Sequence, residues 1–205
     1  MREKDYRRFL EQLDHCVDKN EVILYAYCLM PNHYHLFVET PLGNVQRFMQ
    51  RLNTAYAMYF RYKHNRPGHC WQGRYGAQLV KGDEYIQKLT RYIHLNPVKV
   101  IGWAGKPATE ILKHLNGWEW NSYRGYAALG GPEERLDYRW LKLMQRKTDG
   151  GRRKEYRRYV EWMACRDDED FLKDVAASSY AVGDETYREE VKKEIKEKRL
   201  ERVVT

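Results

Sequence analysis

Hydrophobic and polar residues alternate with a helical period at two places in the first third of the chain. Residues 4–19 and 45–63 each repeat apolar side chains at intervals of three and four positions, with polar side chains between them. This period predicts an amphipathic helix with one buried face in each segment. Between them, residues 22–28 and 33–39 are rich in apolar and aromatic residues that favour strands. The pattern therefore predicts the order helix, strand, strand, helix along this part of the chain.

The interruption between the two strands predicts a β-hairpin that carries two histidines on one face. Pro31 cannot donate to a strand ladder, and Asn32 adopts turn conformations readily. Side chains alternate across a strand, so His33 and His35 point to the same side, about 6.6 Å apart. Two imidazoles at this spacing can converge on one metal ion. The alternative is a pair of exposed or hydrogen-bonded histidines, and the spacing alone leaves both interpretations open.

Helical patterns dominate the rest of the chain. A short strand over 77–80 precedes a helix over 84–95, which stops at Asn96 because Pro97 disfavours helical geometry in the residue before it. Further helices are predicted over 109–115, 136–146, 153–165, 169–177 and 185–202.

One face of the helix over 84–95 carries Tyr85, Tyr92 and Asn96. Tyr92 and Asn96 lie one turn apart, about 6 Å along the helix axis. His94 points off this face, so we do not assign it to a metal site. A tyrosine on a helix usually packs in a core or an interface, so periodicity alone gives Tyr92 no chemical role.

The chain has an excess of positive charge that is concentrated in one segment. Its 205 residues include 37 lysines and arginines against 29 aspartates and glutamates, a formal net charge of +8. No acidic residue lies between Glu39 and Asp83. Solvated surfaces normally mix charges of both signs, so this segment favours an anionic partner such as nucleic acid.

A glycine-rich loop over 65–76 adds aromatic side chains to this basic segment. Interleaved aromatic and basic residues can stack on unpaired bases and hold phosphates. The alternative is a surface loop anchored by a buried Trp71, and the sequence favours neither. The candidate DNA contacts of the segment are Arg47, Arg51, Arg61, Lys63, Arg66, Trp71, Gln72 and Arg74.

Cysteine spacing and hydropathy exclude several classes of protein. The four cysteines form no C-x-x-C pair, so neither a zinc knuckle nor a disulfide framework is indicated. No signal peptide opens the chain, and no apolar run approaches the length of a membrane span. We therefore expect a cytoplasmic protein without a membrane partner.

Four motifs follow one another in residues 29–126. They are Met30-Pro31-Asn32-His33-Tyr34-His35, Trp71-Gln72-Gly73-Arg74-Tyr75, Arg91-Tyr92-Ile93-His94-Leu95-Asn96-Pro97-Val98 and Trp120-Asn121-Ser122-Tyr123. Together they resemble those of the single-tyrosine transposases of the His-hydrophobic-His (HUH) superfamily, with the REP-associated tyrosine transposases as the nearest branch. The resemblance implies an α+β fold: an antiparallel sheet with packed helices, the HUH or ferredoxin-like core, followed by a helical C-terminal region. It assigns residues 1–129 to a catalytic domain and residues 130–205 to a helical extension.

The same resemblance implies a metal-dependent transposase that cuts single-stranded DNA. In that family a tyrosine attacks a phosphodiester, which leaves a 5′-phosphotyrosine linkage and a free 3′-hydroxyl. Carried over by position, Tyr92 is the nucleophile, and His33, His35 and Asn96 bind the metal. The expected cofactor is Mg²⁺, with Mn²⁺ as a substitute because it accepts nitrogen ligands more readily. The expected partner is single-stranded or hairpin DNA, bound by a monomer or a homodimer.

The sequence departs from the family pattern at two places, and the first of them favours an alternative function. Relatives usually carry a β-strand and a basic turn before the first helix, whereas this sequence starts at that helix. A missing strand is expected to leave one sheet edge unpaired. Tyr34 also stands where a smaller aliphatic residue is commoner. The alternative is a catalytically decayed module that binds single-stranded or hairpin DNA without cutting it, and a third interpretation is an RNA-binding protein that uses the Trp71 loop.

Overall fold

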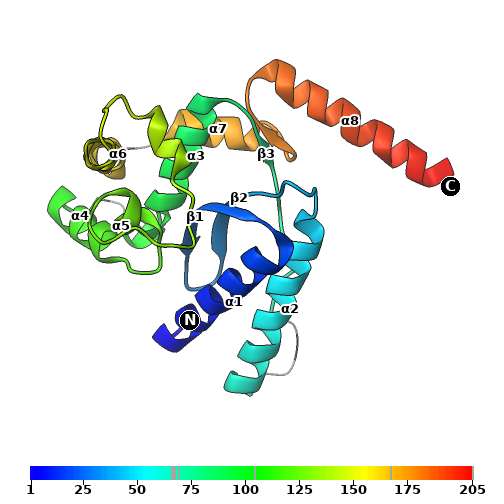
Figure 1. Ribbon diagram of the computed structural model, residues 1–205, viewed down its shortest axis with the longest axis horizontal. Coiled ribbons are helices and arrows are strands. Elements are labelled where there is room, and N and C mark those ends of the chain that lie inside the picture. The colour runs from blue at the N-terminus through cyan, green and yellow to red at the C-terminus, as the bar shows by residue number, and fades with distance from the viewer. Residues whose placement is uncertain (66–67, 69, 104, 167, 205) are drawn as a thin grey trace. The chain divides into compact units, whose positions relative to one another are not determined.

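Figure 1 shows the computed structural model of the protein, which describes residues 1–65, 68, 70–103, 105–166 and 168–204, with residues 101 and 199–204 described by backbone only. Residue contacts divide the chain into two compact units. The first unit comprises Met1–Tyr75 and Thr90–Cys165, and the second comprises Gly76–Leu89 and Arg166–Thr205. These bounds describe contacts, and the division into a catalytic domain and a helical extension at residue 129 stays a prediction.

The first unit is built on an antiparallel β-hairpin between two helices. Strand β1 (Ile23–Leu29) pairs with β2 (Tyr34–Glu39), and α1 (Glu3–Asn20) packs against both β1 and α2 (Val45–His64). Each of these four elements begins and ends within one residue of its predicted bounds. The hairpin packed with helices and the mostly helical C-terminal region confirm the predicted α+β class.

The apolar faces of α1 and α2 meet the hairpin in one hydrophobic core. Phe9 and Leu13 of α1 and Leu52 of α2 are fully buried. The Phe9 ring packs on Tyr34 of β2, with 4.8 Å between the ring centroids, and on Tyr56 of α2, at 5.1 Å. Tyr34 therefore faces the core, where an aromatic residue at this position is accommodated.

The edge of β1 that does not pair with β2 is occupied by a segment from much later in the chain. The Leu29 N–H donates to the Trp120 carbonyl (2.8 Å), and the Ser122 N–H donates to the Tyr27 carbonyl (3.1 Å). These bonds replace a neighbouring strand over this part of β1. This edge of β1 is therefore hydrogen-bonded here, which removes a site for unspecific strand pairing, and the expectation of one unpaired sheet edge stays a prediction.

The remainder of the first unit is helical. Its α-helices are α4 (Ala108–Gly117), α5 (Tyr123–Tyr126) and α6 (Asp149–Ala164), and its 3-10 helices are η1 (Asn96–Val98), η2 (Ile101–Trp103) and η3 (Arg139–Leu143).

The prediction of an α-helix over 136–146 is wrong, because only the short 3-10 helix η3 forms there. The Asp137 N–H donates to the Leu24 carbonyl of β1 (2.9 Å), and the Asp137 carboxylate accepts the Arg139 N–H (2.8 Å). The edge of β1 and the Asp137 side chain thus bind the N–H groups of Asp137 and Arg139, which are then not available for the hydrogen bonds of an α-helix.

The second unit contains a parallel pair of two-residue strands, β3 (Leu79–Val80) and β4 (Ala181–Val182). It also contains α7 (Glu169–Ala176), α8 (Glu185–Val204) and residues 83–89 of α3 (Asp83–Leu95). The boundary between the two units therefore falls inside α3, and residues 90–95 of this helix belong to the first unit. Among the described helices, none has the length and apolar character needed to span a membrane.

A buried carboxylate joins the start of α1 to the end of α2. The Asp5 side chain is buried, and its Oδ1 lies 2.7 Å from the Lys63 Nζ and 3.1 Å from the His64 Nε2. Its Oδ2 accepts the Arg2 N–H at 2.7 Å. Burial raises the pKa of Asp5, but these hydrogen bonds outweigh burial and hold the pKa well below its usual value. Asp5 therefore stabilises the folded state in its ionised form.

We expect Asp5→Asn to lower the free energy of unfolding by about 2–3 kcal/mol at neutral pH, because it removes charge-assisted hydrogen bonds from a buried site. Since the folded-state pKa is depressed, this stabilisation is present above about pH 4 and is lost as the pH falls toward the folded-state pKa. Urea unfolding of both proteins at neutral and acidic pH measures the difference.

The matched control is Glu11→Gln on the same helix, which removes an exposed ion pair with Arg8. It should change the free energy of unfolding by less than about 0.5 kcal/mol. Equal losses from Asp5→Asn and Glu11→Gln would contradict the role given to Asp5.

Candidate active site

Helix α3 and strand β2 place Tyr92 and His35 side by side. Their ring centroids lie 5.7 Å apart, with the rings nearly perpendicular at 81°. His35 lies on β2 opposite Cys28 of β1, and Tyr92 lies on the part of α3 that belongs to the first unit. Both side chains are partly buried. A helix and a strand distant in sequence thus contribute to one cluster.

His33 joins this cluster from the turn that precedes β2. The strand begins at Tyr34, one residue later than predicted, and the His33 carbonyl accepts the Met30 N–H at 2.9 Å. The His33 and His35 ring centroids nevertheless lie 5.1 Å apart. The His33 Nδ1 is 2.8 Å from the Asn32 side-chain oxygen, and the residue is exposed. The two imidazoles therefore lie close together even though His33 is in the turn and not in the strand.

Asn96 completes the cluster at the C-terminal end of α3. Its Nδ2 donates to the Tyr92 carbonyl (2.9 Å) and to the Ile93 carbonyl (3.5 Å). The side chain also makes a hydrogen bond with His35. Because Nδ2 is bound to helix carbonyls, the amide oxygen is the atom available to His35.

Burial sets the protonation of the three ionisable groups. The pKa of His35 is lowered to about 4, first by burial and then by repulsion from His33, against the hydrogen bond with Asn96. Burial also lowers the pKa of His33 and raises that of Tyr92. At neutral pH the imidazoles are therefore uncharged, with lone pairs available, and Tyr92 is a protonated phenol.

The cluster offers a donor set that fits a divalent cation. Two imidazole nitrogens and one amide oxygen, from His33, His35 and Asn96, leave coordination positions for phosphate oxygens and water. Over the part of the chain that the structure describes, no group of three or more His, Cys, Asp or Glu side chains could hold a metal ion. The fit therefore depends on the Asn96 amide as the third donor.

Four of the predicted DNA-binding side chains are exposed: Arg47 and Arg61 on α2, and Gln72 and Arg74 in the loop that follows. Arg66 lies outside the described residues. Exposure leaves the four side chains able to meet a ligand, and their role in DNA binding stays a prediction.

Two basic residues of α2 are instead bonded within the protein. The Arg51 guanidinium donates to the Asn20 side chain at 3.2 Å, and Lys63 forms the ion pair with Asp5 described above. These contacts hold α2 against α1. Any contact of Arg51 or Lys63 with DNA would compete with them.

Trp71 is anchored to the core. Its Nε1 donates to the Asn53 carbonyl (3.0 Å), and its ring lies 5.6 Å from Tyr34 and 5.9 Å from Tyr56 between centroids. These contacts match the anchored-loop interpretation of the sequence. They leave the predicted stacking of Trp71 on a base untested.

Sequence reasoning gave no role to a buried group next to the cluster. His94 is fully buried, with its Nδ1 2.7 Å from the Tyr156 hydroxyl and its Nε2 2.7 Å from the Ser122 hydroxyl. It lies off the face that carries Tyr92, as the helical spacing predicts. The sequence signal for this contact was the Trp120-Asn121-Ser122-Tyr123 motif, which contains the partner Ser122. The motif was part of the family resemblance, but no role was assigned to it.

Residues 1–96 match the family model described as "Transposase IS200 like". This segment is an IS200-like transposase domain. It ends at Asn96 and therefore includes Tyr92 and both histidines of the cluster. No curated protein and no solved structure gave a significant match to the chain. Membership of the IS200-like domain in the REP-associated branch stays a prediction.

We expect Trp71→Ala to lower the free energy of unfolding of the protein by about 2 kcal/mol, because it removes a ring packed on the core and a hydrogen bond. Arg74→Ala, an exposed change in the same loop, should alter it by less than about 0.5 kcal/mol. Urea unfolding of both variants measures the effect. Unchanged stability in Trp71→Ala combined with weakened DNA binding would instead favour the stacking interpretation.

Proposed function

We propose that the IS200-like domain cleaves single-stranded DNA, in hairpin substrates, and joins the ends to a second strand, with Tyr92 as the nucleophile. The main support is the position of the Tyr92 phenol, whose ring centroid lies 5.7 Å from that of His35, the nearer of the two neighbouring imidazoles. The match of residues 1–96 to the IS200-like transposases supports the same class of reaction.

In the proposed step, the Tyr92 hydroxyl oxygen attacks the phosphorus of a phosphodiester. A bond forms between this oxygen and phosphorus, and the bond from phosphorus to the 3′-oxygen breaks. The phenol loses its proton, and the leaving 3′-oxygen gains one. The products are a 5′-phosphotyrosine linkage and a 3′-hydroxyl, and attack by the 3′-hydroxyl of another strand reverses these changes and joins the DNA.

The side chains of His33, His35 and Asn96 would hold a divalent cation, Mg²⁺ in the cell and Mn²⁺ as its substitute. When bound, such an ion withdraws charge from the scissile phosphate and aligns it for in-line attack. The lowered pKa of both imidazoles keeps their lone pairs available at neutral pH. The bond from Asn96 Nδ2 to the Tyr92 carbonyl ties this donor set to the helical turn of the nucleophile.

One chain contains both halves of the proposed site. Tyr92 and His35 of the same chain are in ring contact, and both belong to the first unit. The proposal therefore uses the tyrosine in cis, and a monomer suffices for the cleavage step.

We expect Tyr92→Phe to abolish the covalent protein–DNA adduct while changing the affinity for hairpin DNA less than about twofold, because only the attacking oxygen is removed. The measurement is a denaturing gel after incubation with labelled single-stranded hairpin DNA and Mn²⁺. Tyr85→Phe, on the same helix, is the matched control and should retain the adduct. An undiminished adduct in Tyr92→Phe refutes the assignment. Salt-sensitive hairpin binding without any adduct in the unaltered protein supports the decayed binding module instead.

We expect His35→Gln to weaken Mn²⁺ binding at least about tenfold, since it removes one of three protein donors. Titration followed by the electron paramagnetic resonance of free Mn²⁺ measures the dissociation constant without requiring activity. His15→Gln, an exposed histidine on α1, is the control and should bind as the unaltered protein does. Equal affinity for Mn²⁺ in all three proteins would contradict the proposed metal site.

A further inference from the structure

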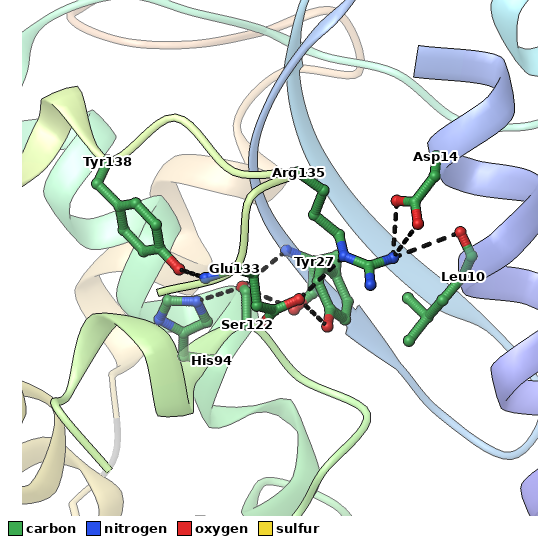
Figure 2. A network of polar contacts seen from close by, with 8 residues as sticks. All are labelled: Leu10, Asp14, Tyr27, His94, Ser122, Glu133, Arg135 and Tyr138. Atoms are coloured by element: carbon green, nitrogen blue, oxygen red, sulfur yellow. Dashed lines mark hydrogen bonds and ion pairs between the residues drawn. The ribbon is translucent and has the colours of Figure 1, made fainter. Parts of the chain in front are cut away.

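A buried hydrogen-bond network attaches the end of α3 to the strand beside His35. His94 lies two positions after Tyr92 on α3 and is fully buried, as is Ser122. The His94 ring contacts the Ser122 hydroxyl through Nε2 and the Tyr156 hydroxyl of α6 through Nδ1, each at 2.7 Å. Figure 2 shows His94 and Ser122 beside β1.

Ser122 in turn binds the backbone of β1 at a single residue. Its hydroxyl donates to the Tyr27 carbonyl (3.1 Å) and accepts the Tyr27 N–H (2.9 Å). The next residue of β1, Cys28, is paired with His35 on β2. A path of hydrogen bonds therefore joins the helix of Tyr92 to the strand pair that carries His35.

One arrangement of protons satisfies all four contacts of this network. The Ser122 hydroxyl proton is used by the Tyr27 carbonyl, so the His94 Nε2 must be the donor to Ser122. The Nδ1 of the neutral ring is then an acceptor, and the Tyr156 hydroxyl donates to it. This arrangement fixes which ring nitrogen of His94 donates and which accepts, and it uses the Ser122 hydroxyl as both donor and acceptor.

A second contact fixes the backbone of the same turn. The Asn121 Nδ2 donates to the His94 carbonyl at 2.8 Å, and Asn121 forms an isolated bridge with Cys28 of β1. Residues 90–95 of α3 belong to the first unit, and His94 is bonded there through both its ring and its backbone carbonyl. The contacts of His94 with Ser122 and Asn121 therefore fix the helical turn that carries Tyr92 relative to β1.

We propose that His94 and Ser122 are positioning residues, which hold α3 against β1 so that Tyr92 stays next to His35. This inference rests on the proposed function, because it explains how the attacking phenol is aligned. Neither residue touches the reacting atoms. Loss of the Ser122 hydroxyl would leave the His94 Nε2–H and the Tyr27 N–H without this partner, and the path of side-chain hydrogen bonds from α3 through Ser122 to β1 would be broken.

The far end of the network supplies a matched control. The Tyr27 hydroxyl donates to Glu133 (2.8 Å), Glu133 pairs with Arg135 (3.1 Å), and Arg135 pairs with Asp14 of α1 (2.7 Å). Figure 2 shows this second half, which leads from β1 to α1 and away from α3. Arg135→Gln breaks it without touching His94 or Ser122.

The experiment compares the unaltered protein with Ser122→Ala, Tyr156→Phe and Arg135→Gln. The first measurement is the rate of covalent adduct formation at saturating hairpin DNA with Mn²⁺, together with the DNA dissociation constant. We expect Ser122→Ala to lower the rate roughly 10- to 100-fold with a dissociation constant changed less than about twofold, since small displacements of a nucleophile are costly. Tyr156→Phe, which retains the His94–Ser122 bond, should lower the rate less, and Arg135→Gln should not lower it.

The second measurement is amide hydrogen exchange, which does not depend on activity. Ser122→Ala should speed exchange in residues 90–96 and leave α1 unchanged relative to the unaltered protein. Unchanged exchange in residues 90–96, or equal rate losses in Ser122→Ala and Arg135→Gln, overturns the positioning role. If the unaltered protein forms no adduct, the proposed function fails, and exchange in residues 90–96 alone decides whether Ser122 holds the helix.

Discussion

The hydrogen bonding of β1 on both of its edges is the constraint on which the candidate site depends. On one edge, Cys28 is opposite His35 of β2, and on the other, Tyr27 is bonded to Ser122. These are neighbouring residues, so the histidine strand and the anchor of α3 are located from the same short stretch of backbone. A shift of either pairing by one residue would reverse which side chains face the site. Both pairings therefore contribute to the proposed alignment of Tyr92 with His35.

Much of the first unit follows from local patterns in the sequence. Helix α1 buries one face from Asp5 to Asn20, and α2 buries one face from Phe48 to Tyr56. This repeated burial of one face produces the helical period that the sequence shows. The spacing of His33 and His35 places their rings together even though β2 begins only at Tyr34. The segment 136–146 fails as an α-helix because the Asp137 N–H is taken by Leu24, more than a hundred positions earlier. A local pattern contains no information about such a partner.

Charge counting along the sequence gives the composition of a segment but not the availability of its side chains. The segment from residue 40 to residue 82 has no acidic residue, yet Lys63 is paired with Asp5, and Arg51 is bonded to Asn20. Both partners lie on α1, outside the segment. The fold thus neutralises part of a basic stretch with groups that a count within the stretch omits. Arg47 and Arg61 of the same segment are exposed, and the role of all these residues in DNA binding stays a prediction.

The histidines of the first unit differ in role because of the partners that their nitrogens already have. Burial lowers the pKa of His94 to about 3 and contributes to the lowered pKa of His35, so both are neutral at physiological pH. A neutral imidazole has one donor and one acceptor, and His94 uses both on Ser122 and Tyr156. It has no lone pair left for a ligand, whereas His33 is exposed and its Nδ1 lies 2.8 Å from the Asn32 side-chain oxygen in the turn before β2. Occupied nitrogens, rather than pKa or sequence spacing, therefore separate a histidine that holds the fold from one that can bind a metal ion.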